Sequence, residues 1–311
     1  MIETFDLTLP HGITLSCRAS GRVGRPVLVF LHGFPEAAFV WDGLLDHFAD
    51  PAHGGFRCVA PNLRGYERSS APADVSAYRT RHLVQDIAAL TDALTADGPT
   101  PGRLAALVAH DWGGALAWGF AAQHPQRLAR LAILNAPHPV AFQRELAESP
   151  AQQQASAYMN FLAQPEAPDL LAADDFARLW PFFTAMAADS GPHAWLDEAM
   201  RARYRDVWRH GLQGGCAYYA ASPLRPPTET NPGARTVTIP PELATVRVPT
   251  LVIWGMGDTA LPPSLLDGLD GLVPDLRIER LAGATHWLVH EQPDRVADLL
   301  GGFVSPGQTP R

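Results

Sequence analysis

Apolar residues along this chain follow two alternating patterns. Short continuous apolar runs such as 27–31 and 250–254 are typical of strands buried on both faces of a mostly parallel sheet. Between such runs, apolar residues recur at helical spacing, as in 79–96, where Leu83 and Ile87 share one face. This alternation predicts an α/β fold with a mostly parallel sheet and right-handed crossovers. The eight strands expected are 3–9, 13–20, 27–31, 56–60, 104–108, 128–134, 250–254 and 277–281.

The strand pattern is interrupted after Pro137, where a long segment of helices and loops is predicted. This segment carries four of the six tyrosines and three of the eight tryptophans. Such a density of aromatic residues is typical of a cap that covers an apolar pocket, although the same residues could instead fill the core of the cap. The expected boundaries are 1–136 and 245–304 for the core domain, 137–244 for the inserted helical cap and 305–311 for a disordered tail.

The sharpest local signal follows the strand expected at 104–108. Ala109 and Gly113 leave room for a tight strand-to-helix turn around Asp111, and this spacing is that of a nucleophile elbow, which normally carries serine in the middle. A carboxylate, with a reference pKa of about 3.9, is ionised at neutral pH and can attack carbon to form an ester. A histidine is then needed for the water that cleaves this ester. Asp111 therefore favours displacement at saturated carbon (epoxide opening or dehalogenation); the alternative role is capping of the next helix.

Composition narrows the function classes. The net charge of −8 over 311 residues argues against a general nucleic-acid binder. No apolar stretch is long enough to span a bilayer, and the N-terminus lacks the features of a signal peptide. The three cysteines lie far apart without a CxxC pair, so neither a disulfide framework nor a thiolate metal site is expected. These features favour a cytoplasmic protein.

Three candidate catalytic residues occur in the order Asp111, Asp258, His286, and each follows a predicted strand. Nucleophile, acid, histidine is the order found in α/β-hydrolases. Because ligands of open α/β sheets bind outside the carboxyl ends of the strands, we expect the three to meet there. His286 could instead be a core histidine, and Asp258 could cap the helix after Pro262. Asn135 occupies the other position where such enzymes carry their acid, but an amide cannot serve, which favours Asp258.

The chain resembles the epoxide hydrolase branch of the α/β-hydrolases over nearly its whole length. A tyrosine-bearing segment in each half of the expected cap is similar to the segments that carry the two catalytic tyrosines of that branch. The segments that carry the resemblance are His32-Gly33-Phe34-Pro35-Glu36, His110-Asp111-Trp112-Gly113-Gly114, Trp254-Gly255 through Asp258 to Pro262, Gly283-Ala284-Thr285-His286 with Glu291 and Pro293, Tyr158-Met159-Asn160-Phe161 with Pro165, and Gly214-Gly215-Cys216-Ala217-Tyr218-Tyr219.

This resemblance implies an eight-stranded α/β-hydrolase core with a cap and a two-step reaction. Asp111 would attack an epoxide carbon while Tyr158 and Tyr219 hydrogen-bond the epoxide oxygen. An alkoxide is a poor leaving group, so ring opening requires such a proton donor. His286, oriented by Asp258, would then activate the water that hydrolyses the ester. The reactants implied are a small apolar epoxide and water.

The resemblance also implies the surroundings of the reacting groups. The backbone N–H groups of Phe34 and Trp112 would hold the oxyanion of the second step, and loss of such a donor costs about 3–4 kcal/mol in other enzymes. Phe34, Pro35, Trp112 and Tyr218 would contact the substrate. No cofactor, metal, nucleic-acid partner or membrane partner is implied, and the protein would be a monomer or a homodimer.

Several aromatic and polar residues leave alternatives open. Tyr218 is the main rival of Tyr219 for the second tyrosine, since adjacent side chains on a helix point in different directions. Tyr204 is expected in the core, and His290 in a structural or surface role. Glu67 replaces a glycine that is usual in the family and could reshape its loop.

Other activities remain possible on the same residues. A haloalkane dehalogenase would also use Asp111, and the indole of Trp112 could bind halide, but that family usually has a polar residue in place of Phe34. Fluoroacetate-type dehalogenases usually have arginine in place of Trp112. A carboxylesterase is disfavoured because the elbow supplies no hydroxyl, and a non-catalytic hydrolase-like binding protein because all three candidate catalytic residues are present.

Overall fold

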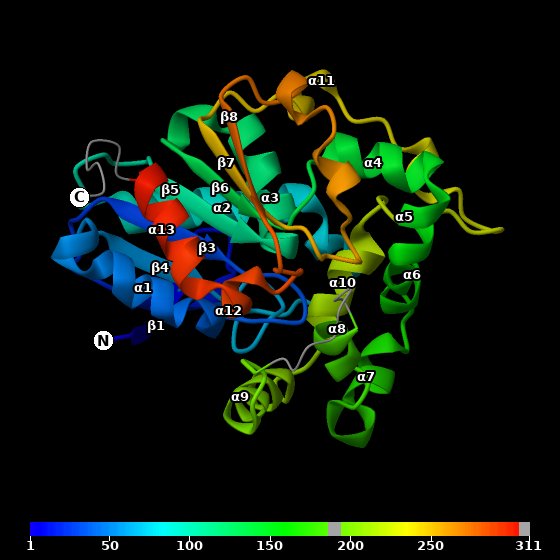
Figure 1. Cartoon of the computed structure of the whole chain (residues 1–311). Coiled ribbons are helices and arrows are strands. Elements are labelled where there is room, and N and C mark those ends of the chain that lie inside the picture. The colour runs from blue at the N-terminus through cyan, green and yellow to red at the C-terminus, as the bar shows by residue number, and fades with distance from the viewer. Residues whose placement is uncertain (186–193, 305–311) are drawn as a thin grey trace.

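The fold is built on one sheet of eight strands, seen in the computed structural model (Figure 1), which describes residues 1–185 and 194–304. The strand order is β1-β2-β4-β3-β5-β6-β7-β8. β2 pairs antiparallel with β1 and β4, and every other neighbouring pair is parallel. The strands are β1 (Glu3–Thr8), β2 (Thr14–Ser20), β3 (Val27–Leu31), β4 (Arg57–Pro61), β5 (Ala106–His110), β6 (Leu131–Leu134), β7 (Thr250–Gly255) and β8 (Leu276–Leu281).

The predicted eight-stranded, mostly parallel sheet with a helical insertion is confirmed, and the strand boundaries shift most at β5 and β6. β5 runs to His110, two residues beyond the expectation, because His110 still pairs with Leu134 of β6. The strands expected at 104–108 and 128–134 both begin later than predicted, since Leu104 and Leu128 meet only in an isolated bridge. The apolar pattern marks burial, which extends beyond the backbone pairing that defines a strand.

Helices cover both faces of the sheet and form its two core layers. Alternate residues of the strands point to opposite faces, so Leu28 and Phe30 pack with α1 and α13 whereas Val29 and Leu31 pack with α2 and α3. The longer helices are α1 (Asp42–Ala49), α2 (Thr80–Thr95), α3 (Asp111–Gln123), α4 (Pro139–Glu148), α7 (Ala167–Phe176), α9 (Glu198–Trp208), α10 (Gln213–Ala221) and α13 (Pro293–Val304). The shorter ones are α5 (Pro150–Ala155), α6 (Tyr158–Leu162), α8 (Trp180–Thr184), α11 (Pro241–Ala244) and α12 (Leu288–Glu291).

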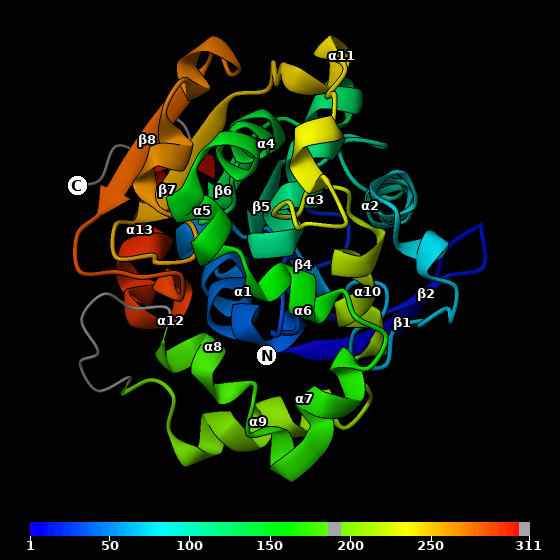
Figure 2. The same cartoon turned by 90° about the vertical axis from the view of Figure 1, so that its right-hand side faces the viewer.

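The chain between β6 and β7 forms a helical insertion, α4 to α11, that lies along one side of the sheet (Figures 1 and 2). Its backbone touches the core where Gly214 of α10 meets Gly65. A Cβ on Gly65 would lie 2.7 Å from the Cα of Gly214, closer than a side chain allows. The indole of Trp208 also donates to the carbonyl of Pro35 over 2.7 Å. These contacts hold α9 and α10 against the core, and α10 carries two of the candidate tyrosines.

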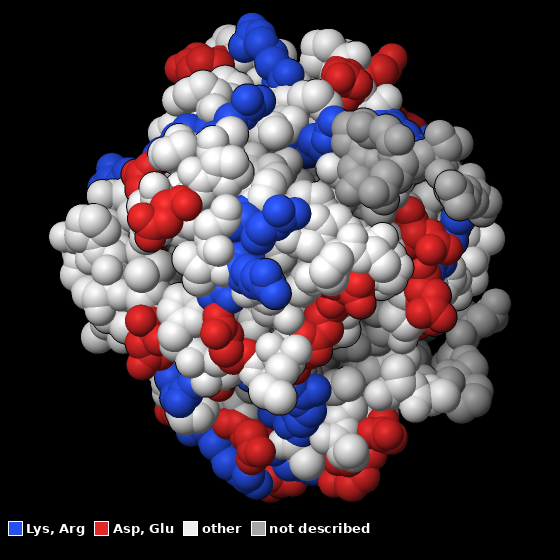
Figure 3. Space-filling view, turned by 90° about the vertical axis from the view of Figure 1, so that its left-hand side faces the viewer, with Lys and Arg blue, Asp and Glu red and all other residues white. Residues whose placement is uncertain are grey.

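On the face that carries β1, α1 and α13, acidic and basic side chains are interspersed (Figure 3). No helix among the described residues is long and apolar enough to cross a membrane. The tail predicted at 305–311 lies outside the described residues.

Candidate active site

Asp111 lies at the turn between β5 and α3, in a left-handed backbone conformation with φ of 50°. Aspartate tolerates this conformation better than most residues because its short polar side chain can bond locally. The turn is tight: a Cβ on Gly113 would lie 2.6 Å from the His32 carbonyl, and one on Gly33 would overlap the Asp111 carboxylate. The backbone N–H of Phe34 donates to Oδ1 of Asp111 over 2.7 Å. The other oxygen of Asp111 is therefore the one left for chemistry.

His286 connects the two candidate carboxylates. Its Nδ1 lies 2.7 Å from Oδ2 of Asp258, and its Nε2 lies 3.8 Å from Oδ2 of Asp111. The loop that carries His286 is held by Glu291, whose carboxylate accepts from both the backbone N–H and the hydroxyl of Thr285. The structure therefore brings the three sequence-predicted residues together at the carboxyl ends of β5, β7 and β8.

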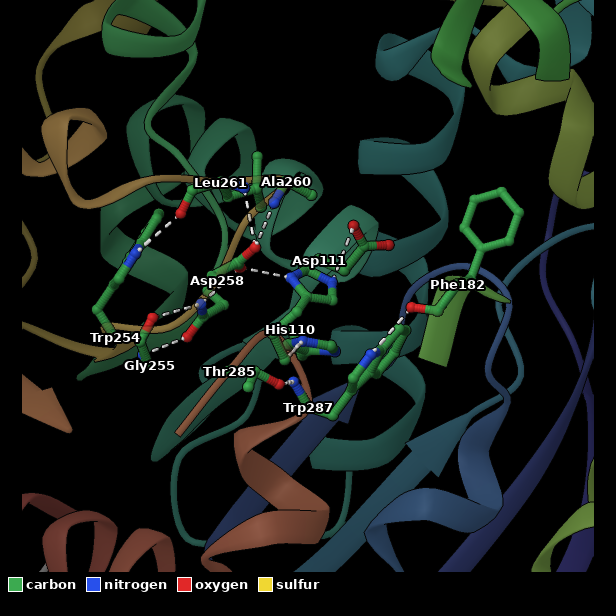
Figure 4. A network of polar contacts seen from close by, with 12 residues as sticks. His110, Asp111, Phe182, Trp254, Gly255, Asp258, Ala260, Leu261, Thr285 and Trp287 are labelled. Carbon is green, nitrogen blue, oxygen red and sulfur yellow. Dashed lines mark hydrogen bonds and ion pairs between the residues drawn. The ribbon is translucent and has the colours of Figure 1, made fainter. Parts of the chain in front are cut away.

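Asp258 is held by more donors than His286 alone. Its Oδ1 accepts from the backbone N–H groups of Ala260 and Leu261 over 3.0 and 2.9 Å (Figure 4). Its Oδ2 also accepts from Nδ2 of Asn135 over 2.7 Å, while Oδ1 of Asn135 accepts from the backbone N–H of Gly255. Asn135, at the rival acid position, thus orients the carboxylate at the position preferred from the sequence.

The surroundings of His286 favour its charged form. Burial would by itself lower the pKa of His286, but the charge of Asp258, its hydrogen bond and the charge of Asp111 together raise that pKa to about 9. His286 is therefore largely protonated at neutral pH. Loss of the negative charge of Asp111 would remove one of the causes that raise the pKa of His286.

A buried cluster behind His286 was missed in the sequence. Oε1 of Glu36 accepts from the hydroxyl of Tyr204 over 2.7 Å and lies 2.7 Å from Nε2 of His290. Its Oε2 lies 3.3 Å from Nδ1 of His110, whose Nε2 donates to the His286 carbonyl over 2.9 Å. Burial raises the pKa of Glu36, but His290 and His110 lower it more, so the carboxyl stays ionised. Tyr204 is buried, as expected. The contact of His290 with Glu36 fits the structural role that was one of the two expected for it.

Tyr158 and Tyr219 line one cavity together with Asp111. Their rings lie 6.1 Å apart at an angle of 73°. Burial raises the pKa of both hydroxyls, and the carboxylate of Asp111 raises it further. Both tyrosines therefore keep their protons at neutral pH and can donate them.

Tyr218 points elsewhere. Its hydroxyl donates to the carbonyl of Arg64 over 3.0 Å, and its ring packs against Tyr66 and Tyr78. It does not line the cavity that contains Asp111, so the substrate contact expected for Tyr218 does not fit this structure. Adjacent residues on a helix point about 100° apart, which explains why only Tyr219 faces the cavity.

Three residues expected near the substrate differ in their placement. The side chain of Trp112 lines the cavity, and its ring meets Tyr219 edge to face at 5.2 Å. Phe34 reaches Asp111 through its backbone, but its side chain does not line this cavity, and neither does Pro35. Substrate contact by Phe34 and Pro35 therefore finds no support in this cavity, whereas the expected donor role of the Phe34 N–H fits the geometry.

The cavity has a volume of about 300 Å³ and extends from Asp111 between α3 and the helical insertion. This volume is at the lower end of the range for pockets that bind small molecules. Most of its lining is apolar, with carboxylate and phenol groups at the end near Asp111. The arrangement can hold an apolar molecule with one polar, reactive group against Asp111.

Comparisons with known proteins agree with this geometry. A family model described as the alpha/beta hydrolase fold matches residues 26–293. An epoxide hydrolase of Caballeronia sordidicola is 30% identical, and the match covers 97% of this chain and 94% of the relative. Two solved structures share a TM-score of 0.84. One, from a study of novel epoxide hydrolases in metagenomes from hot environments, is 36% identical over 98% of this chain and 99% of its own. The other, an epoxide hydrolase of Bacillus megaterium in complex with an inhibitor, is 30% identical over 96% of this chain and 99% of its own.

Proposed function

Because this chain belongs to the α/β-hydrolase fold family, in its epoxide hydrolase branch, we propose that it converts an apolar epoxide and water to a vicinal diol. The observation that carries this proposal is one cavity lined by Asp111, Tyr158 and Tyr219. The cavity combines a carboxylate with two phenols, and opening of a strained ether requires these two kinds of group: a nucleophile for carbon and a proton donor for oxygen.

In the first step, Oδ2 of Asp111 attacks an epoxide carbon and the carbon–oxygen bond of the ring breaks. The alkoxide that forms takes a proton from Tyr219 or Tyr158. The Phe34 N–H holds Oδ1, so this oxygen becomes the carbonyl oxygen of the new ester. The Trp112 N–H, at the start of α3, is proposed as the second donor to that oxygen.

In the second step, His286 accepts a proton from water, and the resulting hydroxide attacks the ester carbon of Asp111. The bond between the ester carbon and the oxygen attached to the substrate breaks, that oxygen takes the remaining proton of the attacking hydroxide, and the diol leaves as the carboxylate is restored. The proton held by His286 then reprotonates the tyrosinate formed in the first step. Asp258 stabilises the charge on His286 through the hydrogen bond of 2.7 Å between them. Esterification removes the negative charge of Asp111, which lowers the pKa of His286 and frees its Nε2 to act as a base.

Incubation with an aryl epoxide and, separately, with a chloroalkane tests the reaction class. We expect the diol from the epoxide and little halide from the chloroalkane, because Phe34 offers no side-chain donor to pair with the indole of Trp112 around a halide. Gas chromatography would measure the diol and a halide electrode the chloride. Halide release without any diol would assign the protein to the dehalogenases instead.

The adjacent residues Tyr218 and Tyr219 provide a matched test of the step in which the epoxide oxygen receives a proton. Tyr219→Phe is expected to lower kcat/KM for the epoxide by about 10²-fold, because a general acid contributes at least this much. Tyr218→Phe removes a hydroxyl from the adjacent residue with the same change in volume, but this hydroxyl bonds Arg64 outside the cavity. It should cost only about 1 kcal/mol of stability and leave kcat/KM within about twofold. Equal losses in the two variants would contradict the assignment of Tyr219.

The raised pKa of His286 predicts a pH dependence of the second step. Ester hydrolysis needs neutral His286, so its rate constant should rise with pH, by tenfold per pH unit well below the pKa, and level off above it. In the free enzyme this pKa is about 9. Because the esterified enzyme lacks the Asp111 charge, the midpoint for hydrolysis should fall below that value. Rapid-quench measurement of ester decay between pH 5 and 10 would check this, and a rate that falls as pH rises would refute it.

A further inference from the structure

The cavity extends from Asp111 in one direction, along α3. Among the residues of this helix that line it are Asp111, Ala115, Gly119 and Gln123. These positions are four residues apart and therefore share one face of the helix. At a rise of 1.5 Å per residue, Gly119 lies about 12 Å and Gln123 about 18 Å from Asp111 along the axis. Gln123 is exposed, so the cavity runs from the half-buried carboxylate of Asp111 to the surface.

The opposite wall of this cavity is apolar and comes from the chain that follows α10. Leu224, Ile239 and Leu243 line it, and Figure 2 shows the segment from α10 to α11 passing over α3. An elongated apolar group would therefore be enclosed between the helix below and this segment above.

Gly119 has no local structural need for glycine. It lies inside α3, where glycine destabilises a helix by about 0.5–1 kcal/mol relative to alanine. Its φ is not in the left-handed region, and a Cβ there would meet no atom closer than 3.5 Å, the Cγ2 of Val84. Neither backbone conformation nor close packing requires glycine at position 119. The effect of glycine there is to leave the space beside the helix open.

The reactive end of the cavity is closed. Beyond Tyr219, the ring of Phe34 packs edge to face against Tyr219 at 5.5 Å and against Phe182 at 5.7 Å. Phe182 also packs edge to face against Tyr158 at 5.7 Å. Neither Phe34 nor Phe182 lines the cavity. Among the described residues, a substrate held against Asp111 thus has the cavity on one side of its epoxide and the packed rings of Phe34 and Phe182 on the other.

We propose, on the basis of the function proposed above, that the substrates are terminal epoxides with one long apolar substituent, which lies along α3 over Ala115 and Gly119. An epoxide with large groups on both carbon atoms would place one of them against Phe34 and Phe182. Ala115 and Gly119 then determine specificity: they set how long and how wide the substituent can be.

A homologous series tests this assignment of substrate class. Terminal epoxyalkanes from butene oxide to dodecene oxide are compared with symmetrical trans-epoxides of the same carbon number. Each buried CH₂ is worth about fourfold in affinity, so kcat/KM for the terminal series should rise by up to about fourfold per added CH₂ until the cavity is filled. The symmetrical trans-epoxides should be slower than their terminal isomers by at least about tenfold.

Two variants at one position localise the effect. Gly119→Leu should lower kcat/KM for the long terminal epoxides by at least about tenfold and leave butene oxide within about twofold. Gly119→Ala adds only a methyl group that fits without a clash, so it serves as the matched control and should retain more of the preference for long chains. Thermal unfolding of both variants shows that each is folded.

The outcomes separate the two proposals. If no epoxide yields diol, the proposed function fails. If diol forms but kcat/KM does not depend on chain length, or symmetrical trans-epoxides react as fast as terminal ones, the function stands and the substrate class is wrong. Equal losses for all substrates in Gly119→Leu would also overturn the inference, because the cavity would then be a passage to Asp111 and not a binding subsite.

Discussion

Replacement of Asp111 by alanine is expected to abolish diol formation, lowering kcat by about 10⁵-fold or more, as loss of a nucleophile does in other enzymes with covalent intermediates. Among the described residues that line the cavity, no other carboxylate is present to take over. Asp258 is fully engaged by His286, Asn135 and two backbone N–H groups, and it does not line the cavity. Diol release under single- and multiple-turnover conditions would measure the loss.

The control for this variant follows from the backbone at the turn. Alanine is strained at the φ of 50° that Asp111 adopts, at a cost of about 1–2 kcal/mol. Asp111→Asn keeps the size of the side chain and its tolerance for this conformation, so a matching loss of activity in both variants would assign the loss to chemistry and not to strain. Intact mass would report any conversion of the introduced amide back to a carboxylate. Full activity of Asp111→Ala would rule out covalent catalysis at this residue.

The arrangement of the three candidate catalytic residues could be predicted because sequence order and sheet geometry act together. Asp111, Asp258 and His286 each follow a strand, and parallel strands bring their carboxyl ends to one edge. The strand boundaries need not be accurate for this inference: β5 ends two residues later than expected, yet Asp111 still directly follows it.

The buried cluster around Glu36 could not be predicted in the same way. Glu36 follows β3, His110 ends β5, Tyr204 belongs to α9 and His290 to α12. No local pattern links four elements so far apart in sequence, and each residue read alone is an ordinary polar side chain. The one available signal was Glu36 itself, since a carboxylate between buried apolar segments requires partners.

The choice between Tyr218 and Tyr219 depended on the direction in which each side chain points from α10, which the sequence did not provide. Both side chains are buried, at 1% and 2% exposure, so apolarity does not separate them. What decides is how α10 is seated on the core, where Gly214 meets Gly65 without intervening side chains. The cavity along α3 is likewise a product of packing between segments, and the small residues that line it resemble ordinary helix residues in the sequence.

Replacement of His286 by alanine should separate the two chemical steps. Attack by Asp111 needs no base, because a carboxylate is already ionised at neutral pH. Hydrolysis of the ester does need one, so we expect the epoxide to react once and the protein to gain the mass of one epoxide. Intact-protein mass spectrometry would detect this adduct, and peptide mapping would place it on Asp111. Turnover should fall by at least about 10³-fold.

The fold should tolerate this change. Without His286, the buried carboxylate of Asp258 keeps three donors: the N–H groups of Ala260 and Leu261 and Nδ2 of Asn135. The double variant Asp111→Asn with His286→Ala should form no adduct, which controls for alkylation of other nucleophiles. If His286→Ala stays unmodified in the presence of an epoxide that the wild-type protein converts, then water and not Asp111 attacks the ring. In that case His286 would have to take a proton from the water that attacks the ring. Its raised pKa, which keeps His286 protonated beside Asp111, would then slow the reaction.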